Sequence, residues 1–215
     1  MTIDQIAKHI DYTMLKAFST WDDIKALCDE AAAHHTASVC IPPSFVKPVH
    51  EAYGPKIRVC TVIGFPLGYN TEETKVFEAR KAIEEGAEEV DMVVNIGDVK
   101  MGKWDKITTE IAALRRASKG KILKVIIETC YDTEEEKIHL CKCVTDAGAD
   151  YIKTSTGFGT AGASLEDIKL FKEHIGPNVK IKAAGGIRTK AAMEAFIEAG
   201  CDRIGASAKF DTLKD

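Results

Sequence analysis

Residues 122–155 read ILKVIIETCYDTEEEKIHLCKCVTDAGADYIKTS, and they contain one complete strand–helix–strand unit. The runs 122–128 and 151–155 are nearly continuously apolar, which is typical of parallel strands covered on both faces. Between them, Thr133 and Glu136 have the spacing of a capping box at the start of a helix. The glycine of 146–148 closes that helix just before the second strand. The stretch therefore predicts a βαβ unit with a parallel strand pair.

The same alternation continues along the rest of the chain. Six further runs read as strands: 9–13, 37–42, 57–65, 89–95, 179–184 and 203–207. Helix starts are marked by Thr20 with Asp23, by Ser164 with Asp167, and by Thr189. Eight strands in strict βα alternation, without a linker, predict a (β/α)8 TIM barrel that forms a single domain over residues 1–215.

An open, doubly wound sheet is the structural alternative, but no strand is followed by the G-x-G-x-x-G turn of nucleotide-binding sheets. Residues 2–8 form an opening helix that we expect to cover the bottom of the barrel. Only eight residues follow Ser207, so the C-terminal end is short and the last helix must be brief or absent.

Composition excludes several classes of function. The 215 residues carry a net charge of -4, so no basic excess suggests nucleic acid or an anionic membrane. No apolar run approaches the roughly 20 residues that span a bilayer, and the N-terminus has no signal pattern. Seven scattered cysteines, without zinc-site spacing, are typical of reduced thiols in a cytoplasmic protein. We expect a cytoplasmic protein with no metal.

Several strands carry polar residues where aliphatic ones are expected. Barrel strands send alternate side chains inward, and barrel enzymes work at the carboxyl ends of the strands. Counting alternation along each strand places these residues inward: Asp11, Thr13, Ser38, Cys40, Asp91, Lys124, Glu128, Lys153 and Lys182. Lys180 has the same parity as Lys182 but lies farther from the catalytic end. Two plain explanations are mutually satisfied ion pairs or a lysine exposed by a wrong parity. Several lysines at matching parity favour a functional site.

The chemistry that needs such a set is amine catalysis. A lysine amine becomes nucleophilic when desolvation or a neighbouring cation lowers its pKa from the usual value of about 10.4. The neutral amine can then condense with a carbonyl to form a Schiff base. A carboxylate such as Asp91 can move protons beside it. Two lysines, Lys153 and Lys182, with this aspartate form a coherent set for aldol chemistry.

The ends of the last two strands carry a second signal. AAGGIRT (183–189) has two glycines before a helix, and GAS (205–207) offers a glycine and a hydroxyl. Backbone N–H groups and a helix N-terminus favour a phosphate, and many barrels bind one after strands seven and eight. A tight turn is the plain explanation of the glycine pair.

Taken together, VDMVVN, DYIKTSTGF, IKAAGGIRT and RIGAS, in this order and spacing, resemble deoxyribose-phosphate aldolases. HIDYTML, SVCIPPSF and VIGFPLGYNTEETKVFEA are similar to the same family, and the resemblance covers about residues 9–207. It implies a class I aldolase on a (β/α)8 barrel, without metal or cofactor, that reversibly cleaves 2-deoxy-D-ribose 5-phosphate into acetaldehyde and D-glyceraldehyde 3-phosphate. Deoxynucleoside catabolism is the usual role of this family.

The resemblance also implies roles for individual residues. Lys153 resembles the Schiff-base lysine, Lys182 the second lysine that lowers its pKa, and Asp91 the acid/base aspartate. Asp11, Thr13, Cys40 and Lys124 match the substrate pocket. The phosphate-binding positions are Gly157, Gly185, Gly186, Arg188, Gly205 and Ser207. The implied partners are small phosphorylated sugars, aldehydes and further copies of the chain, with a homodimer favoured.

The chain departs from the family pattern around the phosphate. Phe158 stands where some members have a lysine, and Ala208 and Lys209 replace a small polar residue and a glycine. Lys209 is a candidate to compensate for these changes. Two other functions stay open at this point. One is another phosphate-binding barrel aldolase or isomerase, and the other is a barrel that binds a metabolite without catalysis.

Overall fold

The computed structural model describes residues 1–213, which form one closed barrel of eight parallel strands in sequential order. The strands are β1 (Ile10–Thr13), β2 (Ser38–Ile41), β3 (Val59–Ile63), β4 (Glu89–Val93), β5 (Ile122–Ile126), β6 (Tyr151–Lys153), β7 (Lys180–Ala184) and β8 (Arg203–Ala206). The pairing of β1 with β8 closes the ring, so the prediction of a (β/α)8 barrel is confirmed.

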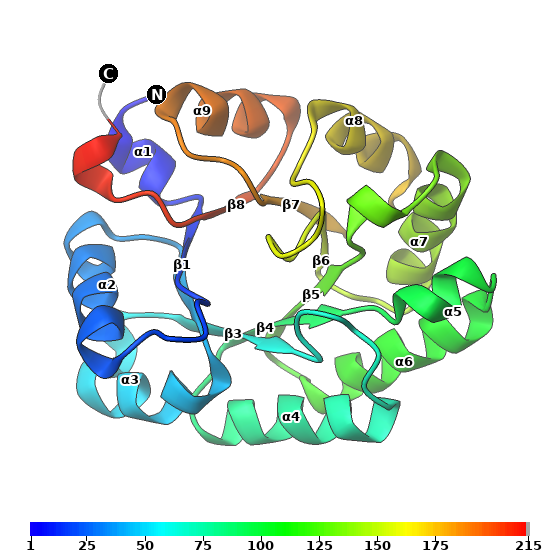
Figure 1. The fold of residues 1–215 in the computed structure, drawn as a ribbon, viewed down its shortest axis with the longest axis horizontal. Coiled ribbons are helices and arrows are strands. Elements are labelled where there is room, and N and C mark those ends of the chain that lie inside the picture. The colour runs from blue at the N-terminus through cyan, green and yellow to red at the C-terminus, as the bar shows by residue number, and fades with distance from the viewer. Residues whose placement is uncertain (214–215) are drawn as a thin grey trace.

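Helices surround the strands (Figure 1). They are α1 (Ile3–Ala7), α2 (Trp21–His34), α3 (Val46–Tyr53), α4 (Glu72–Glu84), α5 (Ile96–Lys100), α6 (Trp104–Ala117), α7 (Glu134–Asp146), α8 (Leu165–His174) and α9 (Lys190–Ala199). The described residues also form the short 3₁₀ turns η1 (Pro43–Phe45), η2 (Gly54–Lys56), η3 (Thr129–Tyr131) and η4 (Phe210–Thr212). Within residues 1–213, no helix has the length and apolar character that crossing a bilayer requires.

The first helix and the segment after β8 pack at the periphery of the barrel. The opening helix α1 contacts α9, and in Figure 1 it lies in the ring of helices, so it covers the edge of the barrel rather than its centre. After β8, the described residues form only the η4 turn. The side chain of Phe210 in this turn is buried and stacks on His34 of α2, which ties the chain end to the barrel.

The helix starts follow the capping signals in the sequence. The hydroxyl groups of Thr20 and Thr133 each accept a hydrogen bond from the backbone N–H three residues ahead. The carboxylates of Asp23 and Glu136 in turn accept one from the backbone N–H of the threonine. At the third helix start, the hydroxyl of Ser164 accepts from the backbone N–H of Asp167, but the carboxylate of Asp167 does not bond back to Ser164, because it binds Lys137 at 2.6 Å. Local sequence therefore specifies where these helices begin, even where one partner has a tertiary contact.

Alternation along the strands separates two layers of different character. The outward side chains, such as Met92, Val125 and Ile152, are fully buried against the helices and form the apolar core. The inward side chains are largely polar, and the apolar cluster inside the barrel is small, comprising Cys40, Cys60 and Val62 with Leu15 and Phe65 beside it. The charged groups of the barrel interior therefore have to satisfy one another.

Candidate active site

Asp91 on β4 is the centre of the barrel interior and is fully buried. Its carboxylate accepts hydrogen bonds from three lysines: Lys124 at 2.9 Å, Lys153 at 2.7 Å and Lys182 at 2.8 Å. Burial alone would raise the pKa of Asp91, but the three ammonium groups outweigh it and hold that pKa well below its usual range. Asp91 is therefore an ionised acceptor in the resting protein.

A second carboxylate holds Lys182 from the other side. Lys182 Nζ lies 2.5 Å from Asp11 Oδ2, and both side chains are fully buried. Burial would lower the pKa of Lys182, yet the carboxylates of Asp11 and Asp91 outweigh it, so the pKa of Lys182 is raised. Lys182 therefore stays protonated and acts as a fixed cation beside Lys153, its register partner across β6 and β7.

The interior network extends to groups that the sequence analysis did not single out. Arg203 Nη2 on β8 donates to Glu89 Oε1 at 3.0 Å, and its Nη1 donates to Asp11. Glu89 also binds Lys124. A sequence signal existed for both missed residues, because Glu89 has the parity of Asp91 and Arg203 has the parity of Gly205.

The charges inside the barrel are nearly balanced. Among the buried side chains, the carboxylates of Asp11, Glu89 and Asp91 face four cations, which are Lys124, Lys153, Lys182 and Arg203. Arg58, whose side chain is 47% exposed, also lies 3.6 Å from Glu89. Loss of one proton from the four buried cations makes the buried set neutral. Lys153 is the member of this set that lines a cavity, so among these described side chains its amine is the one that a ligand can reach.

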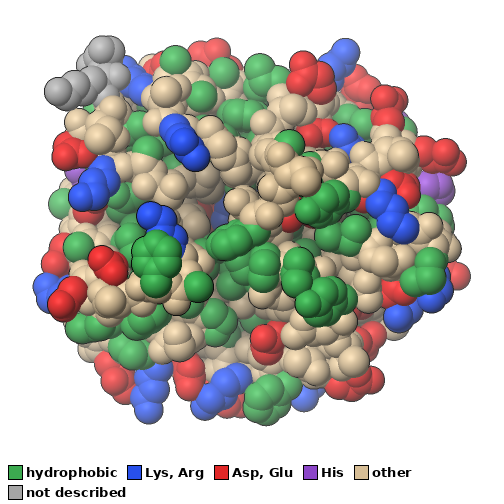
Figure 2. Space-filling view, viewed as in Figure 1, with side chains coloured by type: hydrophobic (Ala, Val, Ile, Leu, Met, Phe, Trp, Pro, Cys, Tyr) green, Lys and Arg blue, Asp and Glu red, His purple; other side chains and the backbone are tan. Residues whose placement is uncertain are grey.

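The cavity has a volume of about 310 Å³ and opens above the ion-pair layer at the carboxyl ends of the strands. It is lined by Thr13, Met14, Leu15, Lys16, Lys153, Thr156, Gly157, Phe158, Ala184, Gly185, Gly186, Ile187, Arg188, Gly205, Ala206 and Ser207. In Figure 1 the loop that follows β6 lies over the centre of the barrel, and Figure 2 shows a hollow on this face beside a band of hydrophobic side chains. A ligand in the cavity would therefore contact Lys153 at its inner end.

Two backbone features shape the cavity wall. Gly185 has φ +88°, and a Cβ on it would lie 2.9 Å from the Cα of Gly162, so the loop after β6 packs directly on the loop after β7. That contact is reinforced by Ala163, whose N–H donates to the carbonyl groups of Ala184 and Gly185. Glycine at 185 is therefore required both by the left-handed backbone and by this close approach.

A buried carboxylate fixes the other side of the loop after β6. Glu128 has φ +57° and accepts hydrogen bonds from Thr156 N at 3.1 Å and from Thr156 Oγ1. The same hydroxyl accepts from Phe158 N at 3.0 Å. A left-handed backbone at a non-glycine residue is uncommon and is sustained only by such surrounding contacts. Glu128 thus connects the end of β5 to the cavity wall.

The structure divides the residues predicted from sequence into two levels. Lys153, Thr13 and all six predicted phosphate-binding positions line the cavity. Asp11, Cys40, Asp91, Lys124 and Lys182 are fully buried in the layer beneath it and do not line it. They support Lys153 from below. Met14, Leu15, Lys16 and Thr156 line the cavity as well, and the sequence analysis did not identify them.

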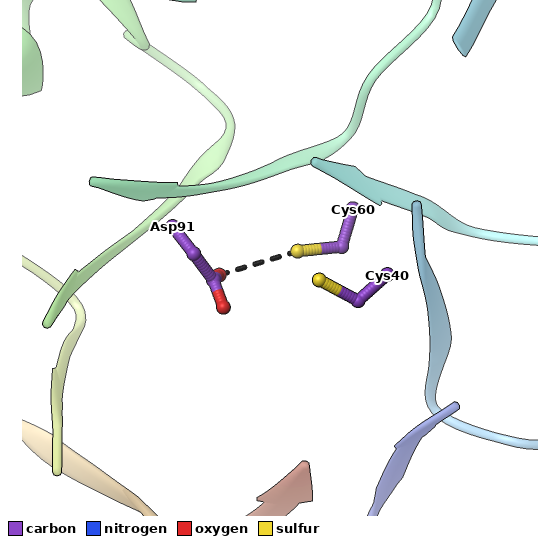
Figure 3. A group of neighbouring side chains, drawn as sticks. All are labelled: Cys40, Cys60 and Asp91. Carbon is purple, nitrogen blue, oxygen red and sulfur yellow. Dashed lines mark hydrogen bonds between the residues drawn. The ribbon is translucent and has the colours of Figure 1, made fainter. Parts of the chain in front are cut away.

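Cys40, Cys60 and Asp91 place three potential metal-ligating atoms within 4.8 Å of one another (Figure 3). Cys60 Sγ donates to Asp91 Oδ1 at 3.2 Å, and Lys124 Nζ lies 3.4 Å from the same sulfur. A divalent ion here would have to displace lysines from Asp91 inside a cluster that already carries a cationic excess. The donor set therefore does not fit a metal cation, and the cysteines fill the barrel interior as small buried groups.

Comparison with known proteins adds one family match, two similar sequences and one similar structure. The family described as DeoC/LacD family aldolase matches residues 1–208. A deoxyribose-phosphate aldolase of Clostridium botulinum (strain Alaska E43 / Type E3) is 61% identical over 98% of this chain and 95% of its own length. A deoxyribose-phosphate aldolase of Clostridioides difficile (strain 630) is 60% identical over 98% and 96%. The tetrameric deoxyribose phosphate aldolase of Aeropyrum pernix superposes with a TM-score of 0.90 at 29% identity, covering 97% and 89%.

Proposed function

The chain belongs to the DeoC/LacD family of aldolases, and from this membership and the site we propose that it is a deoxyribose-phosphate aldolase. It cleaves 2-deoxy-D-ribose 5-phosphate reversibly into acetaldehyde and D-glyceraldehyde 3-phosphate through a Schiff base on Lys153. The observation that carries this proposal is the position of Lys153, which lies 2.7 Å from Asp91 and also lines the cavity.

The first step uses the neutral amine of Lys153. Its nitrogen attacks the C1 aldehyde carbon of the open-chain sugar and forms a carbinolamine, which loses water to give the protonated Schiff base. Asp91 lies within hydrogen-bond distance of the same nitrogen and stabilises the positive charge that develops there. The carbinolamine oxygen needs a proton to leave as water, and ionised Asp91 with protonated Lys182 provides a route for it.

The second step breaks the C2–C3 bond. The C3 hydroxyl gives its proton to Asp91, directly or through water, as the C2–C3 electron pair moves toward the iminium nitrogen. D-glyceraldehyde 3-phosphate departs and leaves an enamine on Lys153. Asp91 then returns that proton to C2 of the enamine, and hydrolysis of the resulting iminium releases acetaldehyde and restores the amine. The fixed ammonium of Lys182, beside Lys153, opposes protonation of the amine between turnovers.

The charge and backbone of the cavity wall suit the phosphate group of the proposed substrate. Of the described residues, none that line the cavity is acidic, and three are cationic: Lys16, Lys153 and Arg188. Gly157, Gly185 and Gly186 expose backbone with positive φ on the same wall. These features suit a phosphorylated sugar whose aldehyde end reaches Lys153 and whose phosphate stays near the mouth.

Borohydride trapping tests the proposal. The protein is incubated with 2-deoxy-D-ribose 5-phosphate and borohydride, and the adduct is located by mass spectrometry of peptides. We expect a stable adduct on Lys153, with none on Lys182 and none in Lys153→Ala. An adduct on another lysine, or none at all, would falsify the mechanism. We also propose that no metal takes part, so dialysis against a chelator should leave turnover unchanged, and a loss restored by metal would contradict this.

Two further proposals concern the protein in the cell. We propose a homo-oligomer, with a dimer favoured, although the relative from Aeropyrum pernix is described as tetrameric. Light scattering coupled to gel filtration measures this state directly, and a monomeric mass at working concentration would refute it. We also propose a cytoplasmic location, in keeping with seven free cysteines. Fractionation that recovers the protein outside the cytoplasm would contradict the second proposal.

A further inference from the structure

The anion-binding end of the cavity lacks a cation at one expected position. Phe158 follows Gly157 on the loop after β6, is 56% exposed, and packs edge-to-face on Phe65 with ring centroids 5.4 Å apart. An aromatic ring there cannot neutralise a phosphate. The N–H of Phe158 is also engaged, because it donates to Thr156 Oγ1. This side of the loop therefore offers a phosphate little beyond Gly157.

The loop after β8 does not supply the missing charge. Lys209 is exposed at the start of η4, and it is not among the residues that line the cavity. Of the cations that do line it, Lys153 is committed to Asp91 and to the substrate aldehyde. Lys16 and Arg188 are the two that remain for an anion.

Lys16 lies on the segment between β1 and α2, three residues after Thr13, which also lines the cavity. Within the part of the chain that the structure describes, its ammonium group forms no ion pair within 4.0 Å, although, after the hydrogen bonds from Thr20, its charge is among the causes that lower the pKa of Asp23. Its ammonium group lies 5.7 Å from the centroid of the exposed Phe18 ring, a weak attraction that an approaching anion easily replaces. A solvated, unpaired cation at the cavity mouth is available to a ligand.

We propose that Lys16 is a phosphate-binding and specificity-determining residue of this aldolase, an inference that rests on the proposed function. It donates to a phosphate oxygen from the β1 side of the cavity, while Gly186 and Arg188 approach from the β7 side. The charge that position 158 lacks is thereby supplied from a different loop. Phe158 and Phe65 form an apolar edge beside this site.

Lys16→Met, Lys16→Arg and Lys119→Met test the inference. Lys119 is exposed and lies just before β5, away from the cavity, so its variant controls for loss of a surface charge. For Lys16→Met we expect KM for 2-deoxy-D-ribose 5-phosphate to rise about tenfold or more, with kcat within about twofold of wild type. The kcat/KM for unphosphorylated 2-deoxy-D-ribose should not change. Lys16→Arg should recover most of the loss, and Lys119→Met should match wild type.

The contradicting results are specific. An unchanged KM in Lys16→Met, or equal losses on the phosphorylated and unphosphorylated sugars, would overturn the assignment of Lys16. Calorimetric binding of glycerol 3-phosphate tests the phosphate-binding role of Lys16 without requiring the aldolase reaction. If wild type binds that anion and Lys16→Met binds it about tenfold more weakly, the role of Lys16 stands even where the aldolase reaction fails. Equal binding by both proteins refutes it.

Discussion

Lys153 and Lys182 donate to the same atom, Oδ2 of Asp91, at 2.7 and 2.8 Å. They are register partners on β6 and β7, so their backbones are neighbours and their ammonium groups converge. Two like charges on one oxygen repel each other. Asp11 binds Lys182 as well, and these carboxylates hold the pKa of Lys182 above its usual range. Lys182 is therefore the protonated, buried member of the pair, whereas Lys153 is the member that lines the cavity.

Replacing Lys182 should change the pH dependence of catalysis. Lys182→Met removes the second ammonium group on Asp91 Oδ2, which is the like charge beside the proposed nucleophile Lys153. We expect kcat/KM to fall by about 10²-fold or more and its acid limb to move to higher pH. Lys182→Arg keeps the charge and should recover part of the rate. Steady-state rates from neutral to alkaline pH measure this. An acid limb that stays in place in Lys182→Met would contradict the charge argument.

Replacing Arg203 should destabilise the fold. Its guanidinium binds Asp11 and Glu89, whose carboxylates are fully buried, so Arg203→Met removes one cationic partner from each. Lys124 remains beside both carboxylates. Breaking one side of such a pair costs about 3–5 kcal/mol of the free energy of unfolding. Denaturant unfolding of Arg203→Met and Arg203→Lys measures the loss, and the lysine variant should lose less. A change below about 1 kcal/mol in the methionine variant would mean that the remaining lysines satisfy both carboxylates without Arg203.

Removing the Glu128 side chain should loosen the cavity wall. In Glu128→Ala the N–H of Thr156 loses its acceptor, which costs about 1–3 kcal/mol when the group is buried. Because this loop lines the cavity and does not hold Asp91, we expect KM to rise by a larger factor than kcat falls. Glu128→Gln retains one acceptor oxygen and should be milder. Steady-state kinetics of the wild type and both Glu128 variants measure these effects. A loss confined to kcat would contradict a role of Glu128 in shaping the cavity.

The two adjacent glycines after β7 should respond differently to alanine. Both have positive φ, +88° at Gly185 and +80° at Gly186, so either alanine variant loses about 1–2 kcal/mol to backbone strain. Only Gly185 would also place a Cβ 2.9 Å from Gly162, whereas nothing lies within 4 Å of that position on Gly186. Thermal unfolding should therefore show Gly185→Ala as the less stable. Equal melting temperatures would argue against the close loop contact.

Asp132 should make stability depend on mildly acidic pH. Its side chain is fully buried beside Lys100, and burial raises the pKa of Asp132 from 3.8 to about 6. The folded protein therefore binds this proton more tightly than the unfolded chain, so stability falls as the pH rises from about 4 through 6. Asp132→Asn should gain about 1–2 kcal/mol over wild type at neutral pH and nothing below about pH 4. Urea unfolding at both pH values measures the difference. A gain that is the same at both would exclude titration of Asp132.

The sequence by itself determined the architecture. Each βα unit carries its own signals, such as the capping boxes at Thr20 and Thr133 and the apolar outward faces of the strands, and these signals are local. Parity also predicted that Asp91, Lys153 and Lys182 share the barrel interior, because alternation along a strand fixes which face a side chain takes. The motifs around these residues then indicated the family.

Only the tertiary structure decided which groups meet and which one is accessible. Strand stagger sets the height of each residue in the barrel, so it places Lys153 at the cavity and leaves Asp11, Lys124 and Lys182 below it. The partnership of Arg203 with Glu89 joins strands that lie far apart in the chain, and neither local pattern nor spacing contains that distance. The approach of Lys16 to the cavity likewise depends on closure of β1 against β8. Long-range geometry thus decides which amine of the set lines the cavity, whereas strand parity alone treats the lysines alike.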